Sequence, residues 1–593
     1  MGSHLDLVIV GIFMTVLVLV GAAFGRLIKN SSDYFRAGGQ GCWWMVGSSI
    51  FICGISAYTF VGNAAGIYSA GWSVLAIYLA NFLSFVAAIF GLGAWYRQMR
   101  AFTFAEVIRK RFGVVAQQVV AHLLVFNGFL WSGVGLYTLA VFMAPLLPGA
   151  SINATIITVA VVVVLFCTIG GNWAVMANDF VLGMVMSVII VIITAMCFIK
   201  AGGIGEFFTA IAQSPAAPNL QFIHSVPAGK SDWVEKYGLS WVLITFIVQF
   251  VNQASLFQGV RYFSVKDGRE AKKAAFLAAV LMGAGLLAFF VPPIFSRVFL
   301  EKEVLAMHPN PVKAMEYSYS VACAHVLPAG TFSILIIAIF SASIGHLDVG
   351  LNRNAALIVR DLIPAHRRLL KLAPINPDRE VRLSKIVTVL SGLLVVGIAM
   401  LYALIRDASI FDVMLKIVTQ LIFPQVIPLL LFLFIRKVPK WSIFSSLVGG
   451  YIPTLILWVI TLTTKTQFSY QQNGFLVFFG GTIGFLISRL FWNRVSEQER
   501  KEILEFYQEM HTPINFKEEV GENNDSFQFV TLGRFSTLIG GLFLFMLIPV
   551  HSFDGRIVVC CISGFVGTVG LLLWSTGRRN LKKEAAAKAA DRT

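Results

Sequence analysis

Residues 43–72 read WWMVGSSIFICGISAYTFVGNAAGIYSAGW, an apolar stretch that is interrupted by five glycines and carries serine, threonine and asparagine side chains. A helix that faces lipid gains nothing from this polarity, whereas an unwound helix inside a bundle exposes carbonyls that can hold an ion or a substrate. The stretch therefore predicts a discontinuous membrane helix at a binding site. The alternative is an unbroken, glycine-packed helix whose hydroxyls bond back to its own turns.

The composition of the whole chain supports a membrane protein. Of 593 residues, 57% are apolar and 13% are charged, against roughly 25% charged in soluble domains. This excludes a soluble globular protein, and the spans contain no HExxH or GxGD pattern, so no enzyme is expected. The net charge is +16, and the basic residues that produce it lie between the apolar runs. This placement indicates a lipid bilayer as the partner and excludes nucleic acid.

About 20 apolar residues cross a bilayer as one helix. Fifteen runs of the chain meet this length within a few residues: 5–27, 42–69, 72–96, 116–146, 152–170, 176–200, 238–262, 272–298, 330–358, 383–405, 409–435, 442–463, 473–492, 532–551 and 556–576. Basic residues gather in every second loop, as in Arg109, Lys110 and Arg111. The positive-inside rule then places the N-terminus outside and the C-terminus in the cytoplasm of a multi-pass protein of the plasma or inner membrane.

Three segments fall outside the predicted spans, at 203–236, 299–329 and 495–530. The first two are long enough to form short amphipathic helices over the extracellular face. The third is expected to form a solvated cytoplasmic helix. The seven cysteines show no metal-ligand spacing and are interpreted as packing residues.

A series of motifs resembles the sodium/solute symporter family, which includes sodium/glucose, sodium/proline and sialic acid cotransporters. The matching segments are SDYFRAGG at 32–39, WW at 43–44, ISA at 55–57, YSAG at 68–71, TFAEVIRKRFG at 103–113, GGNWAVMANDF at 170–180, NQ at 252–253 and LN at 351–352. Their order and spacing cover residues 5–435.

The resemblance implies an all-α integral membrane fold with a LeuT-like inverted repeat of five plus five helices, one extra helix before it and about four after it. The expected divisions are 1–41 for the N-terminal helix and cytoplasmic loop, 42–200 for the first repeat, 201–237 for an extracellular loop, 238–435 for the second repeat, and 436–593 for the C-terminal helices and cytoplasmic tail. The implied activity is sodium-coupled symport of a small polar organic solute by alternating access. The run 238–262, with its Thr, Asn and Gln side chains, is the counterpart of the broken run 43–72 in the second half.

Family members hold a coupling sodium between carbonyls of the first core helix and a carbonyl plus two hydroxyls of the eighth. The resemblance places the carbonyls on Ile52, Ile55 and Ala342. The two hydroxyl positions fall on Gly345 and His346, which supply no side-chain oxygen for a hard cation. This departs from the family pattern, and Ser341 or Ser343 can replace them only after a local shift of register.

Ionisable residues inside a membrane are costly and are by default functional. Asp179 matches a family aspartate near a second sodium position, and His346 and Asp348 lie in the ninth predicted span. Three hypotheses follow. In the first, sodium binds with charge supplied by Asp179 and Asp348; in the second, His346 titrates and a proton is the coupling ion; in the third, coupling is lost and the protein transports passively or senses.

The sequence restricts the identity of the solute less than it restricts the fold. The family's sugar-binding positions correspond to Tyr78, Asn81, Thr245 and Lys416, and the glutamate and glutamine that bind sugar hydroxyls are absent, which disfavours glucose and galactose. Lys416 has two interpretations. It binds the carboxylate of an anionic substrate, or its side chain reaches the membrane interface or pairs with Asp412. The full set of expected substrate-facing residues is Ser56, Tyr58, Thr59, Tyr78, Asn81, Thr245, Asn252 and Lys416.

Overall fold

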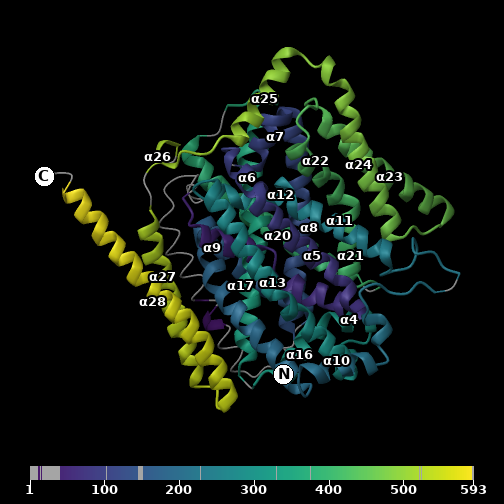
Figure 1. Cartoon of the computed structure of the whole chain (residues 1–593), viewed down its shortest axis with the longest axis vertical. Helices are drawn as coiled ribbons and strands as arrows, with labels where there is room; N and C mark the ends of the chain where they lie inside the picture. The colour runs from purple at the N-terminus through teal and green to yellow at the C-terminus, as the bar shows by residue number, and fades with distance from the viewer. Residues whose placement is uncertain are drawn as a thin grey trace.

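The computed structural model describes residues 11–13, 15, 40–101, 103–144, 151–227, 229–328, 330–373, 376–405, 407–519, 521 and 524–590. Every element named in this part of the chain is a helix, as predicted, and the described residues include one isolated backbone bridge between Gly41 and Val265. Figure 1 shows the resulting helical bundle. Apart from residues 11–13 and 15, the predicted first span at 5–27 lies outside the described residues.

The first core helix is broken, as its glycines predict. Helix α3 (Trp43–Cys53) ends at Gly54, and the chain continues through a π-helical turn at Thr59–Asn63 into α4 (Ala64–Ala70). The last turn of α3 tightens because the N–H of Gly54 donates to Phe51 O and that of Ile55 donates to Ile52 O. The unbroken alternative is therefore wrong.

A second broken helix stands in the other half of the chain. Helix α11 (Leu239–Ala254) ends at Ser255, and α12 (Leu256–Gly259) with the 3₁₀ turn Val260–Ser264 continues after a 40° bend. Ser255 is extended, with φ −79° and ψ 162°, so it cannot carry the helix onward. One discontinuous helix in each half is the arrangement found in transporters built from inverted repeats.

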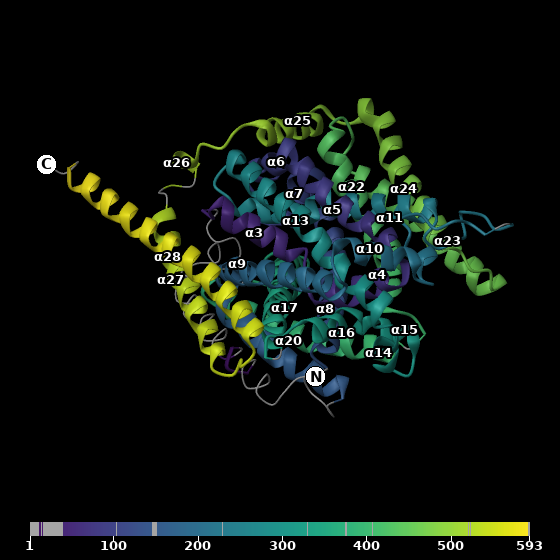
Figure 2. The ribbon, with the colours of Figure 1, turned by 60° about the horizontal axis from the view of Figure 1, so that its bottom comes forward.

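The remaining helices of the bundle pack around these breaks in two groups that meet at α9. They are α5 (Leu75–Ala87), α6 (Gly93–Gln98), α7 (Phe104–Phe112), α8 (Val114–Met143), α9 (Ile152–Lys200), α13 (Gly268–Phe299), α17 (Phe332–Asp348), α20 (Pro377–Leu404), α21 (Ile410–Ile417), α22 (Phe423–Phe434), α23 (Ser442–Thr464), α24 (Tyr470–Ile487), α27 (Asp525–Leu544) and α28 (Phe553–Ala590). Helices α3, α4 and α5 pack on α13, and α5 also packs on α11; α8 and α9 pack on α17 and α20, and α9 also packs on α3 and α13. Each group therefore joins helices from both halves of the chain (Figure 2).

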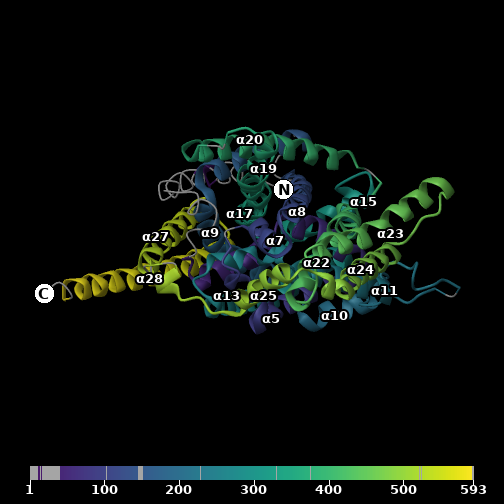
Figure 3. The ribbon, with the colours of Figure 1, turned by 90° about the horizontal axis from the view of Figure 1, so that it is seen from above.

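Short helices cover the two ends of the bundle. The expected loop helices occur as α10 (Ile204–Gln213) in the first loop and as α14 (Glu301–Ala306), α15 (Pro311–Ala314) and α16 (Ser318–Val326) in the second. The predicted polar helix of the 495–530 segment occurs as α25 (Glu497–His511), followed by α26 (Phe516–Glu519). In Figure 1, α10 and α16 lie at one end and α25 lies at the other, which faces the viewer in Figure 3.

The number of fifteen spans is not reproduced in the described part of the chain. Ten of its helices are long and apolar enough to cross a membrane, or eleven if the bent pair at Ser255 counts as one span. The predicted spans 152–170 and 176–200 form one helix, α9, of 49 residues. Residues 171–175 contain no proline, and the glycines at 170 and 171 alone do not interrupt the helical backbone.

Helices α23 and α24 approach each other through facing glycines, as membrane helices do where small residues allow close contact. A Cβ atom added at Gly480 would overlap the carbonyl oxygen of Gly449.

We therefore expect Gly480→Val to lower the free energy of unfolding by about 1–3 kcal/mol through overpacking. Thermal unfolding followed by tryptophan fluorescence in detergent checks this. Gly564→Ala is the control, because a Cβ there meets no atom within 4 Å, and equal melting temperatures of the two variants would contradict the expected close contact.

Candidate functional site

A cavity lies where the two broken helices meet, and its lining combines residues of both halves. Its polar lining consists of Ser56, Tyr58, Thr59, Asn63, Asn81, Thr103, Ser132, Thr245, Gln249, Asn252, Gln253, Gln258, Ser264, Asn352 and Tyr470, with Arg261 and Arg353 as charged members. Among the described residues, no aspartate or glutamate lines it. A site of this composition suits a solute rich in hydrogen-bonding groups and disfavours a cationic one.

Six of the eight predicted substrate residues line this cavity: Ser56, Tyr58, Thr59, Asn81, Thr245 and Asn252. The other two lie elsewhere. The hydroxyl of Tyr78 accepts a hydrogen bond from Asn63 Nδ2 at 3.3 Å, one layer behind the lining. The side chain of Lys416 is exposed and does not face the cavity.

Hydrogen bonds between helices orient part of the lining. Gln249 Nε2 donates to Asn81 Oδ1 at 2.7 Å, which joins α11 to α5, and Thr245 Oγ1 donates to Tyr470 Oη at 3.4 Å. Asn252 is buried, and its Oδ1 atom has no hydrogen-bond partner among the described residues. A buried acceptor without a partner is costly, so this oxygen is available to a donor on a bound solute.

The candidate set from the sequence omitted several of these lining residues. Gln249 lies four residues after Thr245 and three before Asn252, so helical spacing alone places it on the same face. Tyr470 stands more than two hundred residues further along the chain, at the start of α24. No local pattern marks Tyr470, because only the packing of α24 against α11 brings it to the cavity.

The break in the first core helix is bonded directly to α17. The N–H of Ala57 donates to Ser343 Oγ at 2.9 Å, and Ser343 Oγ donates to Ile339 O at 2.7 Å. Two residues earlier, Ser341 Oγ is buried and has no partner in the part of the chain that the structure describes, and the carbonyl of Ser341 accepts from Asn178 Nδ2 at 3.3 Å. Oxygen atoms of α17 therefore stand beside the break.

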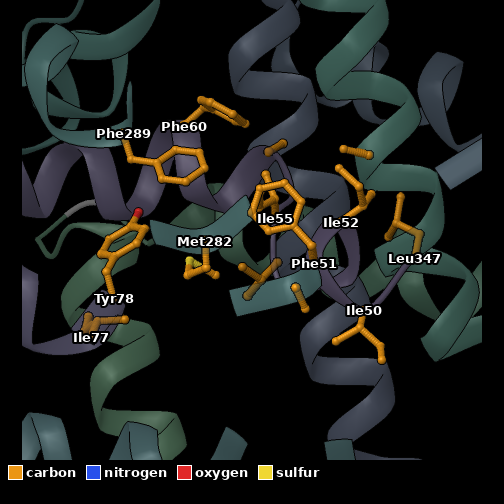
Figure 4. Close-up of a cluster of buried hydrophobic side chains, with 14 of the residues drawn as sticks. Ile50, Phe51, Ile52, Ile55, Phe60, Ile77, Tyr78, Met282, Phe289 and Leu347 are labelled. Carbon is orange, nitrogen blue, oxygen red and sulfur yellow. The ribbon is translucent and has the colours of Figure 1, made fainter. Parts of the chain in front are cut away.

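The side chains of Ile52 and Ile55 belong to the apolar core around this break. Figure 4 shows both among hydrophobic neighbours that include Phe51, Met282 and Leu347, and each is 1% exposed. Only their carbonyl groups can therefore contact an ion. Helix α17 also contains His346 and Asp348, whose side chains lie outside the described residues.

Asp179 on α9 is buried within the same region. Ser49 Oγ donates to its Oδ2 atom at 2.7 Å, and Arg261 Nη1 donates to the same serine hydroxyl at 3.1 Å. Arg261 Nη2 lies 2.8 Å from Cys53 Sγ at the end of α3. A carboxylate and a guanidinium thus share one hydroxyl, which offsets part of the cost of burying both charges.

The cavity extends toward the end of the bundle that carries the basic loops. Thr103 and Phe104 at the start of α7 line that part of it, together with Ser264 and Arg353. At the opposite end, Phe411 of α21 packs directly against Gly66 of α4, where an added Cβ would stand 2.9 Å from the phenyl ring. The cavity lining therefore reaches the start of α7 at one end of the bundle, and α21 packs closely on α4 at the other end.

Comparison with known proteins agrees with this geometry. Residues 34–450 match the family model described as "Sodium:solute symporter family". The chain belongs to the sodium:solute symporter family. The matched range contains both broken helices and nearly every residue of the cavity, Tyr470 being the exception.

Two bacterial relatives and one mammalian relative illustrate the similarity. A sodium/sialic acid symporter, NanT, from Aliivibrio fischeri is 24% identical over 514 residues, 83% of this chain and 94% of the relative. SiaT, a sodium/sialic acid symporter of Proteus mirabilis, is 24% identical over 453 residues, 75% of this chain and 87% of the relative. Sodium/glucose cotransporter 2 of Rattus norvegicus is 23% identical over 492 residues, 75% of this chain and 70% of the relative.

A solved structure shares the fold of this symporter. It is the substrate-bound, outward-open state of a Na⁺-coupled sialic acid symporter, with a TM-score of 0.66 at 18% sequence identity, covering 83% of this chain and 98% of that one. The helical transporter fold expected from the sequence is thereby confirmed in its architecture.

The closed end of the symporter is held by a buried ion pair. Glu316 accepts from Tyr137 Oη at 3.0 Å and from the N–H of Ile410, the first residue of α21, at 2.9 Å. Lys313 Nζ lies 3.1 Å from Glu316 Oε1, the same oxygen that accepts the N–H of Ile410. A second pair, Lys236 with Asp412 at 2.8 Å, joins the loop before α11 to α21. These contacts fix the helix that covers the cavity.

Removing Glu316 leaves Lys313 buried without its partner, which costs about 3–5 kcal/mol. We expect Glu316→Ala to lower the thermal stability of the symporter strongly. The double variant Lys313→Met/Glu316→Gln should recover much of the loss, because no uncompensated charge remains. Thermal unfolding in the same detergent measures both variants, and a Glu316→Ala protein as stable as the parent would contradict the structural role of this pair.

Proposed function

We propose that this symporter couples the downhill movement of sodium to the uptake of a small polar organic solute by alternating access. The proposal is supported by one polar cavity at the meeting point of two broken helices, whose lining extends to the start of α7 at one end of the bundle while α21 packs on α4 at the other. Transporters of this architecture bind at such breaks and expose the site to each side in turn.

Sodium, as the co-substrate, binds in this proposal at the break between α3 and α4. The carbonyls of Ile52, Ile55 and Ala342 and the hydroxyls of Ser341 and Ser343 supply its oxygen ligands, which a hard cation prefers. The hydrogen bond between Ala57 and Ser343 supports this assignment, since it brings a hydroxyl of α17 to the break. Ser343 and Ser341 then serve in place of Gly345 and His346, which offer no side-chain oxygen.

The buried carboxylate of Asp179 supplies negative charge to the same region. Its contact with Ser49 connects it to α3, the helix that ends at the break. A change in the charge near Asp179 therefore acts on α3, and so on the break, through the Ser49 hydroxyl. Asp348 keeps its predicted role as a further charge, and His346 its predicted role if the coupling ion is a proton.

The solute is a hydroxylated organic molecule, neutral or anionic. The lining offers amide and hydroxyl groups from both repeats, and its two charged members are arginines. A sialic acid carries a carboxylate, an amide and several hydroxyls, so the substrate of the bacterial relatives satisfies this chemistry and is the first probe to use.

The orientation follows the basic loops. The end that carries α7 and α25 faces the cytoplasm, and the end that carries α10 and α16 faces outward, in agreement with the positive-inside rule. The repeats correspond to residues 42–200 and 238–435. The cavity is then open to the cytoplasm.

Uptake into proteoliposomes tests the coupling. We expect N-acetylneuraminate to accumulate under an inward sodium gradient and not under a choline gradient of equal ionic strength. Asp179→Asn should abolish the sodium-driven uptake at unchanged protein level, and Lys416→Met, which alters an exposed side chain, should leave it intact. A proton would be the coupling ion instead if uptake is independent of sodium, follows an inward proton gradient and is lost in His346→Ala.

Asn252 tests whether the cavity holds the solute. Its buried, unpartnered oxygen should accept a hydrogen bond from the substrate, so Asn252→Leu is expected to raise KM for the transported solute about tenfold, equivalent to roughly 1.4 kcal/mol. Initial rates over a range of solute concentrations at saturating sodium measure this. An unchanged KM would contradict the assignment of the cavity as the substrate site.

A further inference from the structure

Residues 496–519 form a segment, here named the α25–α26 strap, that lies beyond the 34–450 range shared with the family. It begins at Ser496, whose hydroxyl caps α25 by accepting from the N–H of Glu499, and it ends with α26. In Figure 2 it runs across the end of the bundle near α6 and α7. The strap therefore lies over the end toward which the cavity extends.

The strap is bonded to both repeats of the symporter. The hydroxyl of Tyr507 accepts from Arg111 Nε at 3.1 Å and donates to Phe432 O at 2.6 Å, so one group joins α7 of the first repeat to α22 of the second. Lys110 pairs with Glu509 at 3.6 Å on the first side, and the N–H of Lys440 donates to Glu499 Oε1 at 2.9 Å just beyond the second repeat.

Arg100 makes the most extensive contact with the strap. Its Nε and Nη2 atoms donate to Glu519 at 2.6 and 2.9 Å, and its Nη1 and Nη2 atoms donate to the carbonyls of Glu509, Thr512 and Pro513 at 3.1–3.3 Å. The hydrogen bond from Arg100 holds the pKa of the Glu519 carboxyl below its usual range, so this carboxyl is ionised at neutral pH.

The backbone of Arg100 is in the left-handed region, with φ +50°, a conformation that non-glycine residues rarely adopt. Arg100 lies in the turn between α6 and α7. Thr103 and Phe104, at the start of α7, line the cavity. A side chain with five contacts to the strap thus fixes the turn beside the open end of the cavity.

We propose that the α25–α26 strap is a clasp that stabilises the state in which the cavity is open toward α7, and that Arg100 is the positioning residue through which it holds the α6–α7 turn. Alternating access moves one group of helices against the other, and the strap contacts both repeats. The paired bonds of a planar guanidinium to a carboxylate require a narrow geometry, so closing this end of the cavity must break or rearrange them. Contacts made in one state only raise the population of that state.

Native Cys53 reports on this state, because it lies at the end of α3 and lines the cavity. The experiment uses the full chain in nanodiscs, with Cys560→Ser and Cys561→Ser to remove the two exposed thiols. The rate at which Cys53 reacts with a charged maleimide is measured without solute or sodium. We expect Arg100→Gly and Glu519→Gln each to slow labelling about three- to tenfold, since the open state is less populated.

The variants separate the clasp from general damage to the fold. Glycine adopts φ +50° freely, so Arg100→Gly removes the side chain and keeps the turn, and Glu519→Gln leaves the carbonyl contacts of Arg100 in place. Lys501→Gln is the matched control, because Lys501 pairs at 4.0 Å with Glu505 on the same helix and both are exposed; it should label at the parent rate. Labelling of the first two variants at or above the parent rate, with melting temperatures near that of the parent, would overturn the proposal.

The proposal rests on the alternating-access function, but the labelling needs neither uptake nor a known solute. If the strap variants label more slowly and the parent protein takes up no tested solute, the clasp is supported and the choice of solute is wrong. Normal sodium-driven uptake with unchanged labelling in both strap variants supports transport and refutes the clasp.

Discussion

The structure depends on one constraint, which is that a helix broken inside a low-dielectric bundle must find partners for the backbone groups that the break releases. In the first core helix, the N–H groups of Gly54 and Ile55 turn back to carbonyls of α3, and the N–H of Ala57 reaches Ser343 on α17. The packing of α17 beside the break is therefore a requirement of the backbone as well as a means of building a site. The second break at Ser255 meets the first across the cavity.

The two ends of the cavity differ in the kind of contact that surrounds them. The end covered by α21 is held by one buried pair and by close packing: Glu316 with Lys313 and the N-terminus of α21, and Phe411 against Gly66. At the end covered by the strap, buried Arg111 bonds to Tyr507, and the partly exposed Arg100 and Lys110 pair with glutamates of the strap.

Much of the fold was predictable from local chemistry. Glycines and hydroxyls between Trp43 and Trp72 indicated the first break, and polar residues at helical spacing in 238–262 indicated the second. The basic loops grouped at one end, as their positions in the sequence imply. The joined helix α9 was not predictable, because the 170–176 interval that separates the two apolar runs is compatible with a helix.

The site was predictable only where its residues share one segment. Ser56, Thr59, Thr245 and Asn252, which line the cavity, were predicted because they interrupt apolar runs, whereas Tyr470 reaches the cavity through packing of distant helices. The substrate role of Lys416 stays a prediction; its side chain is exposed and lies outside the cavity lining, which fits the alternative in which this lysine reaches the interface. Ser343 was recognised only as an alternative, because an ungapped register cannot show which hydroxyl of α17 faces the break.

The central claim is that sodium binds at the break between α3 and α4 against α17. Hydrogen–deuterium exchange of the purified symporter, in sodium and in potassium at equal ionic strength, tests it without a known solute. The account predicts slower exchange in sodium for the backbone amides of residues 54–59 and for the α17 segment 341–346, with the strap peptides as a comparison from outside the ion site. Equal exchange of residues 54–59 and 341–346 in the two salts would contradict it.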